Sequence, residues 1–119
     1  MQGREMSDVD SVFTQFYENL RLPDYFGWNW NALYDCLSDL NWLATTHFLL
    51  IVDDAESVLS ESPEERPVFF RILLRSAEHW ANKPNFPHRT KSTFRVILLC
   101  DPVVRGKLSG EVARAQELL

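Results

Sequence analysis

The chain has 119 residues, of which 45% are hydrophobic and only 4 are glycine. These values exclude a disordered or collagen-like chain, and the length suits one domain with a self-sufficient hydrophobic core. The formal net charge of −5 argues against general nucleic-acid binding, which depends on neutralising phosphates. We therefore expect a single acidic domain over residues 1–119.

The acidic residues are unevenly distributed along the chain. Residues 22–65 contain nine Asp and Glu residues and no Lys or Arg, so the remainder carries a net charge of +4. A one-sided field of this kind attracts a basic partner and accelerates its encounter. A charge run considered alone is more simply explained as a solvated acidic surface.

The first amphipathic segment predicts a helix over residues 7–20. Apolar residues recur at helical spacing from Val9 to Leu20, and Ser7 with Asp10 resembles a shortened capping box. Residues 1–6 are too few and too polar for a full strand, and they lack the apolar core of a secretory signal. Since no apolar run reaches the ~20 residues that cross a bilayer, the sequence predicts a cytoplasmic protein.

Residues 22–40 predict an aromatic loop followed by a short helix. Pro23 stops the first helix, and Gly27 marks a position that needs positive φ or a close backbone approach. Asn29 is a natural N-cap, because its side chain can accept from free N–H groups of the first helical turn. The loop also carries Tyr25 and Trp28, for which partner contact and burial are equally reasonable expectations.

The helix that follows has two distinct faces. Its apolar face has the spacing i, i+3, i+4 and i+7 and consists of Leu33, Cys36, Leu37 and Leu40, with Trp30 placed to join it in the core. The opposite face has no Lys or Arg to neutralise its acids and consists of Asn31, Tyr34, Asp35, Ser38 and Asp39. We expect the first face to pack and the second to bind a partner.

Two continuous apolar runs predict the strands of a parallel sheet. They cover His47–Val52 and residues 94–100, and each ends at an aspartate. Runs without alternation are typical of parallel strands buried on both faces. Between them the sequence predicts a helical turn over residues 55–59 and a helix over residues 66–82, so the layout is an α/β crossover.

The C-terminal third is less regular. Residues 83–93 contain two prolines and predict an exposed loop. Gly106 and Gly110 are expected to break the chain before a terminal helix over residues 111–118, which makes residues 102–119 a C-terminal extension. Cys36 and Cys100 both fall in apolar segments and are expected to be buried and unpaired rather than joined in a disulfide.

One stretch also carries a family resemblance. This stretch closely resembles the barstar family, whose members inhibit bacterial ribonucleases. The matching residues are Leu22-Pro23-Asp24-Tyr25-Phe26-Gly27, Asn29, and Ala32-Leu33-Tyr34-Asp35-Cys36-Leu37. The order of the remaining helices and strands extends the looser resemblance over about residues 3–101. It implies an α/β barstar-like fold: a small parallel sheet of two clear strands, its first strand shortened or lost, about four helices and an extra C-terminal helix.

The resemblance also implies which residues would contact a partner. Asp35 matches the aspartate that family members insert into a ribonuclease, and flanking contact positions match Tyr25, Asn29, Tyr34 and Ser38. Asn31 stands where the family has a second acid, and Asp39 stands where it has a small residue. We therefore expect an enzyme other than barnase as the partner. The full predicted contact set is Tyr25, Trp28, Asn29, Asn31, Tyr34, Asp35, Ser38 and Asp39.

Enzyme chemistry is poorly supported by the sequence. His47, His79 and His88 are scattered, with no pair at metal-ligand spacing, and there is no phosphate-binding glycine loop. Asp35 and Asp39 could form an acid–base pair, but side chains at this spacing project from a convex helix rather than into a cleft. No catalytic residue, metal or cofactor is expected.

These observations favour a bacterial immunity protein of a toxin–antitoxin pair. It would inhibit a basic ribonuclease that is extracellular or injected, by blocking the active site with the acidic helix and the aromatic loop before it. The alternative is a barstar-like interaction module that binds a basic partner other than a nuclease. We expect no direct contact with nucleic acid or membrane, and a monomer, with a dimer through the missing first strand as the alternative.

Overall fold

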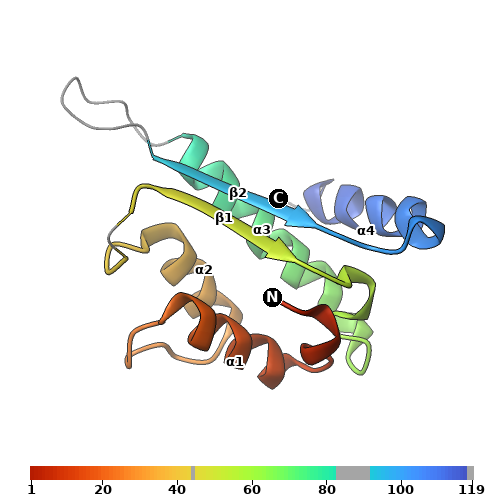
Figure 1. Ribbon diagram of the computed structural model, residues 1–119, viewed down its shortest axis with the longest axis horizontal. Helices are drawn as coiled ribbons and strands as arrows, with labels where there is room; N and C mark the ends of the chain where they lie inside the picture. Colours follow the sequence, from red (N-terminus) through yellow and green to blue (C-terminus); the bar gives the residue numbers. More distant parts are fainter. Residues whose placement is uncertain (44, 83–91, 118–119) are drawn as a thin grey trace.

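The computed structural model describes residues 1–43, 45–82 and 92–117. Its helices and strands are α1 (Val9–Leu20), α2 (Trp30–Asp39), β1 (His47–Val52), α3 (Arg66–Ala81), β2 (Thr93–Leu98) and α4 (Arg105–Glu117) (Figure 1). Short 3₁₀ turns cover Gly3–Glu5, Ala55–Ser57, Pro63–Glu65 and Pro102–Val104. The predicted α/β fold with a small parallel sheet is confirmed, and α4 is the C-terminal helix. Most of the predicted loop, residues 83–91, lies outside the described residues.

The described sheet has two parallel strands in the order β1-β2, with a register from His47 opposite Thr93 to Val52 opposite Leu98. Figure 1 looks onto this sheet, with α3 passing behind both strands. Leu50 and Val52 are buried on the helix side, whereas Leu49 and Ile51 are 58% and 40% exposed. The prediction of strands buried on both faces is therefore wrong. No helix in the described ranges covers the second face. An apolar run in the sequence does not show whether one face of a strand or both faces are covered.

The N-terminal strand is reduced to a single bridge between Gln2 and Asp53. Gly3 continues it by donating its N–H to the Asp53 carbonyl oxygen at 2.6 Å. A Cβ at Gly3 would lie 2.1 Å from the carbonyl oxygen of Asp54, so only glycine fits this approach. The chain then turns directly into α1.

Helix α1 begins one residue later than the capping signal predicted. Asp8, not Ser7, is the N-cap: its Oδ1 accepts from the Ser11 backbone N–H at 2.8 Å, and the Ser11 Oγ accepts from the Asp8 N–H at 3.0 Å. The hydrogen bonds from Ser11 hold the pKa of the Asp8 carboxyl below its ordinary value. Ser7 and Asp8 are both suitable N-cap residues, so the sequence alone did not distinguish them. Asp8 is the N-cap because it forms the reciprocal hydrogen bonds with Ser11.

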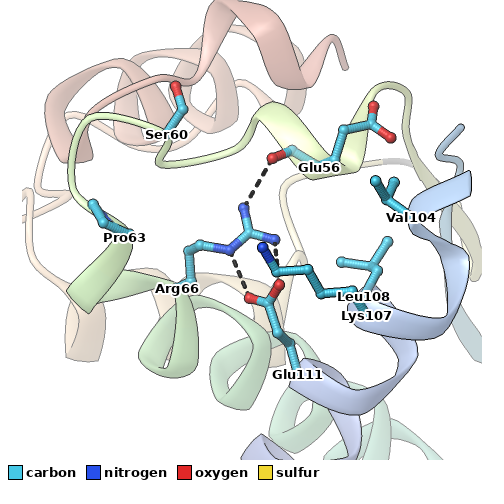
Figure 2. Close-up of a pocket in the computed structure, with 8 residues that line it drawn as sticks. All are labelled: Glu56, Ser60, Pro63, Arg66, Val104, Lys107, Leu108 and Glu111. Carbon is cyan, nitrogen blue, oxygen red and sulfur yellow. Dashed lines mark hydrogen bonds and ion pairs between the residues drawn. The ribbon is translucent and has the colours of Figure 1, made fainter.

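Helix α4 is continuous across Gly106 and Gly110, so the predicted break is wrong. Glycine weakens a helix interior by only about 1 kcal/mol per residue relative to alanine. Tertiary packing outweighs this cost, because α4 buries Leu108 and Ala115. It is also fixed by an ion pair in which the Arg66 Nε lies 2.7 Å from the Glu111 Oε2 (Figure 2).

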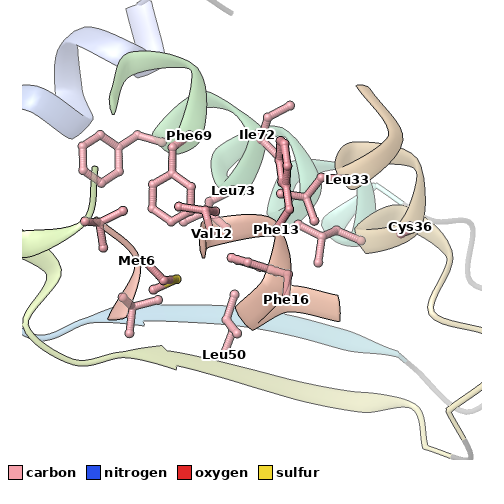
Figure 3. Close-up of a cluster of buried hydrophobic side chains, with 14 of the residues drawn as sticks. Met6, Val12, Phe13, Phe16, Leu33, Cys36, Leu50, Phe69, Ile72 and Leu73 are labelled. Atoms are coloured by element: carbon pink, nitrogen blue, oxygen red, sulfur yellow. The ribbon is translucent and has the colours of Figure 1, made fainter. Parts of the chain in front are cut away.

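The hydrophobic core joins all these elements around aromatic contacts. Phe16 of α1 and Phe69 of α3 meet edge to face, with ring centroids 6.2 Å apart, and both are fully buried (Figure 3). Leu33 and Leu37 bring the inner face of α2 to the same cluster. Close packing of this kind resists small shifts of α2. The helix is therefore held as a rigid part of the domain.

Candidate functional site: the outer face of α2

Helix α2 divides its side chains between core and surface. Leu33, Cys36 and Leu37 are buried on the inner face. On the outer face, Asn31, Asp35 and Asp39 are exposed, and Tyr34 and Ser38 are half-buried. We call these five residues the outer face of α2. Because the inner face is fixed in the core, the exposed carboxylates project from a rigid support.

Both ends of α2 are closed by local hydrogen bonds. The Asn29 Oδ1 accepts from the Ala32 N–H at 2.8 Å, which confirms the predicted N-cap. At the other end Leu40 adopts a left-handed conformation with φ 50° and donates its N–H to the Cys36 carbonyl oxygen at 3.1 Å. Asn29 itself remains exposed, so its side chain caps the helix and still lies at the surface.

Two tryptophans tie α2 to α3 at both ends. The Trp30 Nε1 donates to the Glu65 Oε2 at 2.9 Å, and the Trp80 Nε1 donates to the Leu37 carbonyl oxygen at 2.8 Å. Trp30 is half-buried and Trp80 is buried, so both bonds are partly or wholly shielded from water. These links run the two helices side by side in the same direction and fix the orientation of the outer face.

The aromatic loop before α2 presents two rings to solvent. Tyr25 is 77% exposed, and Trp28 is 47% exposed although its ring stacks on Tyr17 at 5.6 Å. Positive φ occurs at Trp28 (52°) rather than at Gly27, so that part of the glycine prediction is wrong. Gly27 instead allows a close approach, since a Cβ there would lie 3.1 Å from the Asn29 Nδ2.

The loop is also anchored to α1. The Tyr17 hydroxyl donates to the Asp24 Oδ1 at 3.2 Å, and this bond raises the pKa of Tyr17. Tyr17 is the residue on which Trp28 stacks, so one side chain supports two parts of the loop. The exposed rings of Tyr25 and Trp28 are therefore carried by a supported segment beside α2.

The carboxylates of the outer face have no cationic partner among the described residues. The ion pairs found among the described residues are Arg4–Asp54 and Arg66–Glu111, and neither involves α2. Burial raises the pKa of the Cys36 thiol on the inner face, and the charges of Asp35 and Asp39 raise it further. The outer face thus carries carboxylates that form no ion pair with other described residues.

Sequence reasoning missed one basic neighbour of this surface. Arg75 of α3 places its guanidinium 4.9 Å from the centre of the Tyr34 ring. The absence of Lys and Arg holds for residues 22–65, but the parallel packing of α3 brings a cation to the border of the outer face. The helical period of residues 66–82 already put Arg75 on the outward side of its helix, but nothing in the sequence showed that this side meets Tyr34.

Ser38 contributes less to the surface than its position suggested. Its Oγ is buried and has no hydrogen-bond partner among the described atoms. In this conformation the hydroxyl is not available to a partner. The fully exposed polar side chains of the outer face are those of Asn31, Asp35 and Asp39, and Tyr34 is half-buried.

The described residues also form a cavity away from the outer face of α2. A cavity of about 320 Å³ is lined by residues that include Arg66, Lys107 and Glu111, and none of its lining residues belongs to α2. Arg66 makes internal bonds there with Glu111 and with the carbonyl oxygen of Glu56 (Figure 2). It also donates to the carbonyl oxygen of Val58. Within the described ranges, no group of three His, Cys, Asp or Glu residues is arranged to hold a metal ion.

None of the described helices combines the length and the apolarity that a membrane span requires.

Comparisons with known proteins identify the family of the chain. The model of the family described as Barstar (barnase inhibitor) matches residues 1–98, and the chain belongs to this family of inhibitor proteins. Among curated proteins, "Putative ribonuclease inhibitor YrdF" of Bacillus subtilis (strain 168) is 31% identical over 85 residues, which cover 62% of this chain and 93% of that protein. No solved structure gave a significant match.

Proposed function

We propose that this barstar-family protein inhibits a bacterial ribonuclease by inserting the outer face of α2 into the enzyme's active site. The observation that carries the proposal is the state of Asp35. It is exposed on a helix that is capped at both ends, and it has no cationic partner among the described residues. A carboxylate in this state is available to an external cation.

The physical basis is charge complementarity with a phosphate-binding pocket. An enzyme that cleaves RNA gathers Lys, Arg and His side chains around the scissile phosphate, and these cations repel one another when the pocket is empty. A carboxylate can replace the phosphate and form charge-assisted hydrogen bonds inside the desolvated pocket. Since α2 is already rigid, little conformational entropy is lost when it binds.

The residues around Asp35 favour an enzyme other than barnase. Asn31 lacks the charge that family members carry at that position, and Asp39 adds a charge one turn beyond Asp35. Arg75 borders the face through its contact with Tyr34. A partner that fits this pattern has cations opposite Asp35 and Asp39 and a neutral or acidic group opposite Arg75.

The aromatic loop would extend the contact beyond the pocket. Tyr25 and Trp28 are large, exposed and held beside α2, and rings of this type often dominate binding energy at interfaces. Asn29 lies between them and the helix. In this arrangement the acids would enter the pocket and the rings would cover its rim.

The biological setting follows from the same chemistry. A cell that secretes or receives a ribonuclease needs an inhibitor in its cytoplasm, where the RNA is. We therefore place this protein in the cytoplasm as the immunity protein of a toxin–antitoxin pair. A basic partner that is not a nuclease is the second candidate, because the outer face would bind a cationic surface whether or not that surface belongs to a nuclease.

The test begins with capture of the partner. The immobilised chain is exposed to secreted and cellular proteins of its source bacterium, and the captured protein is purified and assayed for RNA cleavage with and without the chain. Asp35→Ala is then compared with Glu18→Ala, which removes an exposed acid from α1. We expect Asp35→Ala to weaken binding by at least ~2 kcal/mol, as at a hot spot, and to change the free energy of unfolding by less than ~1 kcal/mol.

Three outcomes are informative. Loss of RNA cleavage in the presence of the chain, with binding that depends on Asp35 and not on Glu18, supports the proposal. A captured basic protein without ribonuclease activity supports the second candidate. Equal affinity of Asp35→Ala and the unaltered chain contradicts both.

A further inference from the structure

The side of the sheet away from the helices forms a second surface. Leu49 and Ile51 of β1 are 58% and 40% exposed, and Ile97 and Leu99 in or next to β2 are 42% and 47% exposed. The register pairs Ile51 with Ile97, so these side chains form one contiguous patch. Figure 1 looks directly onto this side, and no described segment lies in front of it. We call it the open face of the sheet.

The open face is charged at both ends, with opposite signs. Strand alternation places His47 and Arg95 on this face near the starts of the strands. The register pairs Arg95 with Leu49, and the His47 Nδ1 lies 2.9 Å from the Thr93 Oγ1. At the other end the alternation of β1 continues to Asp53, which follows the strand directly. The exposed Asp101 lies three residues beyond β2, where its side chain accepts from the Val103 N–H at 2.9 Å.

The acidic end remains net negative although two cations lie near it. The Arg4 guanidinium forms an ion pair with Asp54, and the Met1 ammonium donates to the Ile51 carbonyl oxygen at 2.8 Å. Arg105 belongs to the other side of the sheet, where it lines a cavity with Leu98 and Cys100. From one end to the other, the open face is therefore basic, then aliphatic, then acidic.

We propose that a second copy of this chain docks on the open face, with its strands antiparallel to those of the first copy. A two-fold axis through the middle of the patch would place Arg95 of each copy over the acidic end of the other and pack the aliphatic side chains together. A surface with this order of charges is complementary to itself. It would cover both apolar patches at once. The sequence predicted a monomer, with a dimer through the missing first strand as the alternative.

The dimer is expected to be weak and to leave the outer face of α2 free. Two strands of six residues cover about 20 Å by about 10 Å, much less than a stable interface requires. Helix α2 packs against α3 and does not contribute to the open face, so partner binding and self-association use separate surfaces. The inference therefore does not depend on the proposed function.

Analytical ultracentrifugation of the purified chain over a range of concentrations tests the proposal. We expect a reversible dimer with a dissociation constant below about 1 mM. Leu49→Lys and Ile97→Lys should each raise that constant at least about tenfold. Ala113→Lys is the matched control, because Ala113 is exposed on α4 and lies outside the open face, and it should leave the constant unchanged.

A charge exchange tests the orientation of the two copies. Arg95→Asp and Asp53→Arg should each weaken self-association alone, and an equimolar mixture of the two variants should recover the dimer, because opposite charges then face each other at both ends. Asp101→Arg is a second acidic-end variant for the case that Asp53→Arg disturbs folding, which circular dichroism detects. A chain that stays monomeric at about 1 mM, or a dimer that is indifferent to both lysine variants, would overturn the proposal.

Discussion

The outer face of α2 and the open face of the sheet are two uncovered surfaces of the described domain, and they have opposite character. The first carries Asn31, Asp35 and Asp39 in the open. The second exposes Leu49, Ile51, Ile97 and Leu99. Each is the outer side of an element whose inner side reaches the core. The sequence of a helix such as α2 itself shows which of its sides is polar and exposed. Whether an apolar side of a strand is exposed depends on whether another segment of the chain packs over it.

The difference shows how much a hydrophobic pattern reveals. In α2 the 3.6-residue period separates apolar from polar positions, so the sequence itself assigns the two faces. In β1 both alternating sets are apolar, so the pattern is the same whether one side or both are covered. The exposure of one set was decided by the placement of the helices.

The largest expected effect compares two identical substitutions. Leu37→Ala removes a fully buried side chain from α2 and should lower the free energy of unfolding by about 2–5 kcal/mol, because it leaves a cavity. Leu49→Ala acts on the open face and should lower it by less than about 1 kcal/mol. Urea denaturation at a concentration where the chain is monomeric measures both. Equal losses would show that the open face is covered in solution.

The next effect concerns ionic strength. The association rate of the captured partner should fall about tenfold between low and high salt, because the unpaired acids of α2 attract it over a distance that salt screens. Self-association through the aliphatic centre of the open face should change less steeply. Stopped-flow fluorescence and ultracentrifugation measure the two responses. A partner association rate that is independent of salt would exclude electrostatic steering by α2.

A smaller effect is expected from Arg75→Gln. Loss of a cation beside the outer face should raise the association rate of a basic partner, while loss of the contact with the Tyr34 ring, worth about 0.5–1 kcal/mol, should also raise the dissociation rate. Arg114→Gln on α4 is the control for net charge alone. Surface plasmon resonance separates the rates, and unchanged rates for Arg75→Gln would remove Arg75 from the site.

The smallest effect is a difference between two thiols. Burial raises the pKa of Cys36, which lies beneath the outer face of α2, whereas Cys100 follows the sheet and is half-buried. At pH 8 iodoacetamide should modify Cys100 before Cys36, as mass spectrometry would show, and in urea the difference should disappear. Faster modification of Cys36 would place its side chain outside the core.

The same pKa shift has a consequence for stability. A raised pKa means that folding favours the neutral Cys36 thiol, so its contribution is complete below the ordinary value of 9.0 and is lost as pH rises through the folded value. Cys36→Ala should remove this alkaline decline. Denaturation at pH 8 and pH 10 measures it.

A local structural role could be predicted where only one residue of the sequence was suited to it. Asn29 was the obvious N-cap before α2, and its Oδ1 makes that bond. Ser7 and Asp8 competed at α1, and the sequence favoured the wrong one. Gly106 and Gly110 suggested a break, but the ion pair between Arg66 and Glu111 supplied long-range stabilisation that no local pattern contains.

The sequence by itself determined the α/β class, the two-sided character of α2 and the acidic partner-binding candidates, because helical periodicity and charge are local properties. Tertiary structure alone decided that Arg75 borders Tyr34, that the Ser38 hydroxyl is buried and that one side of the sheet is open. Each of these results depends on which distant segment packs against which face. That choice is made by the shared core, where residues far apart in the chain exclude water together.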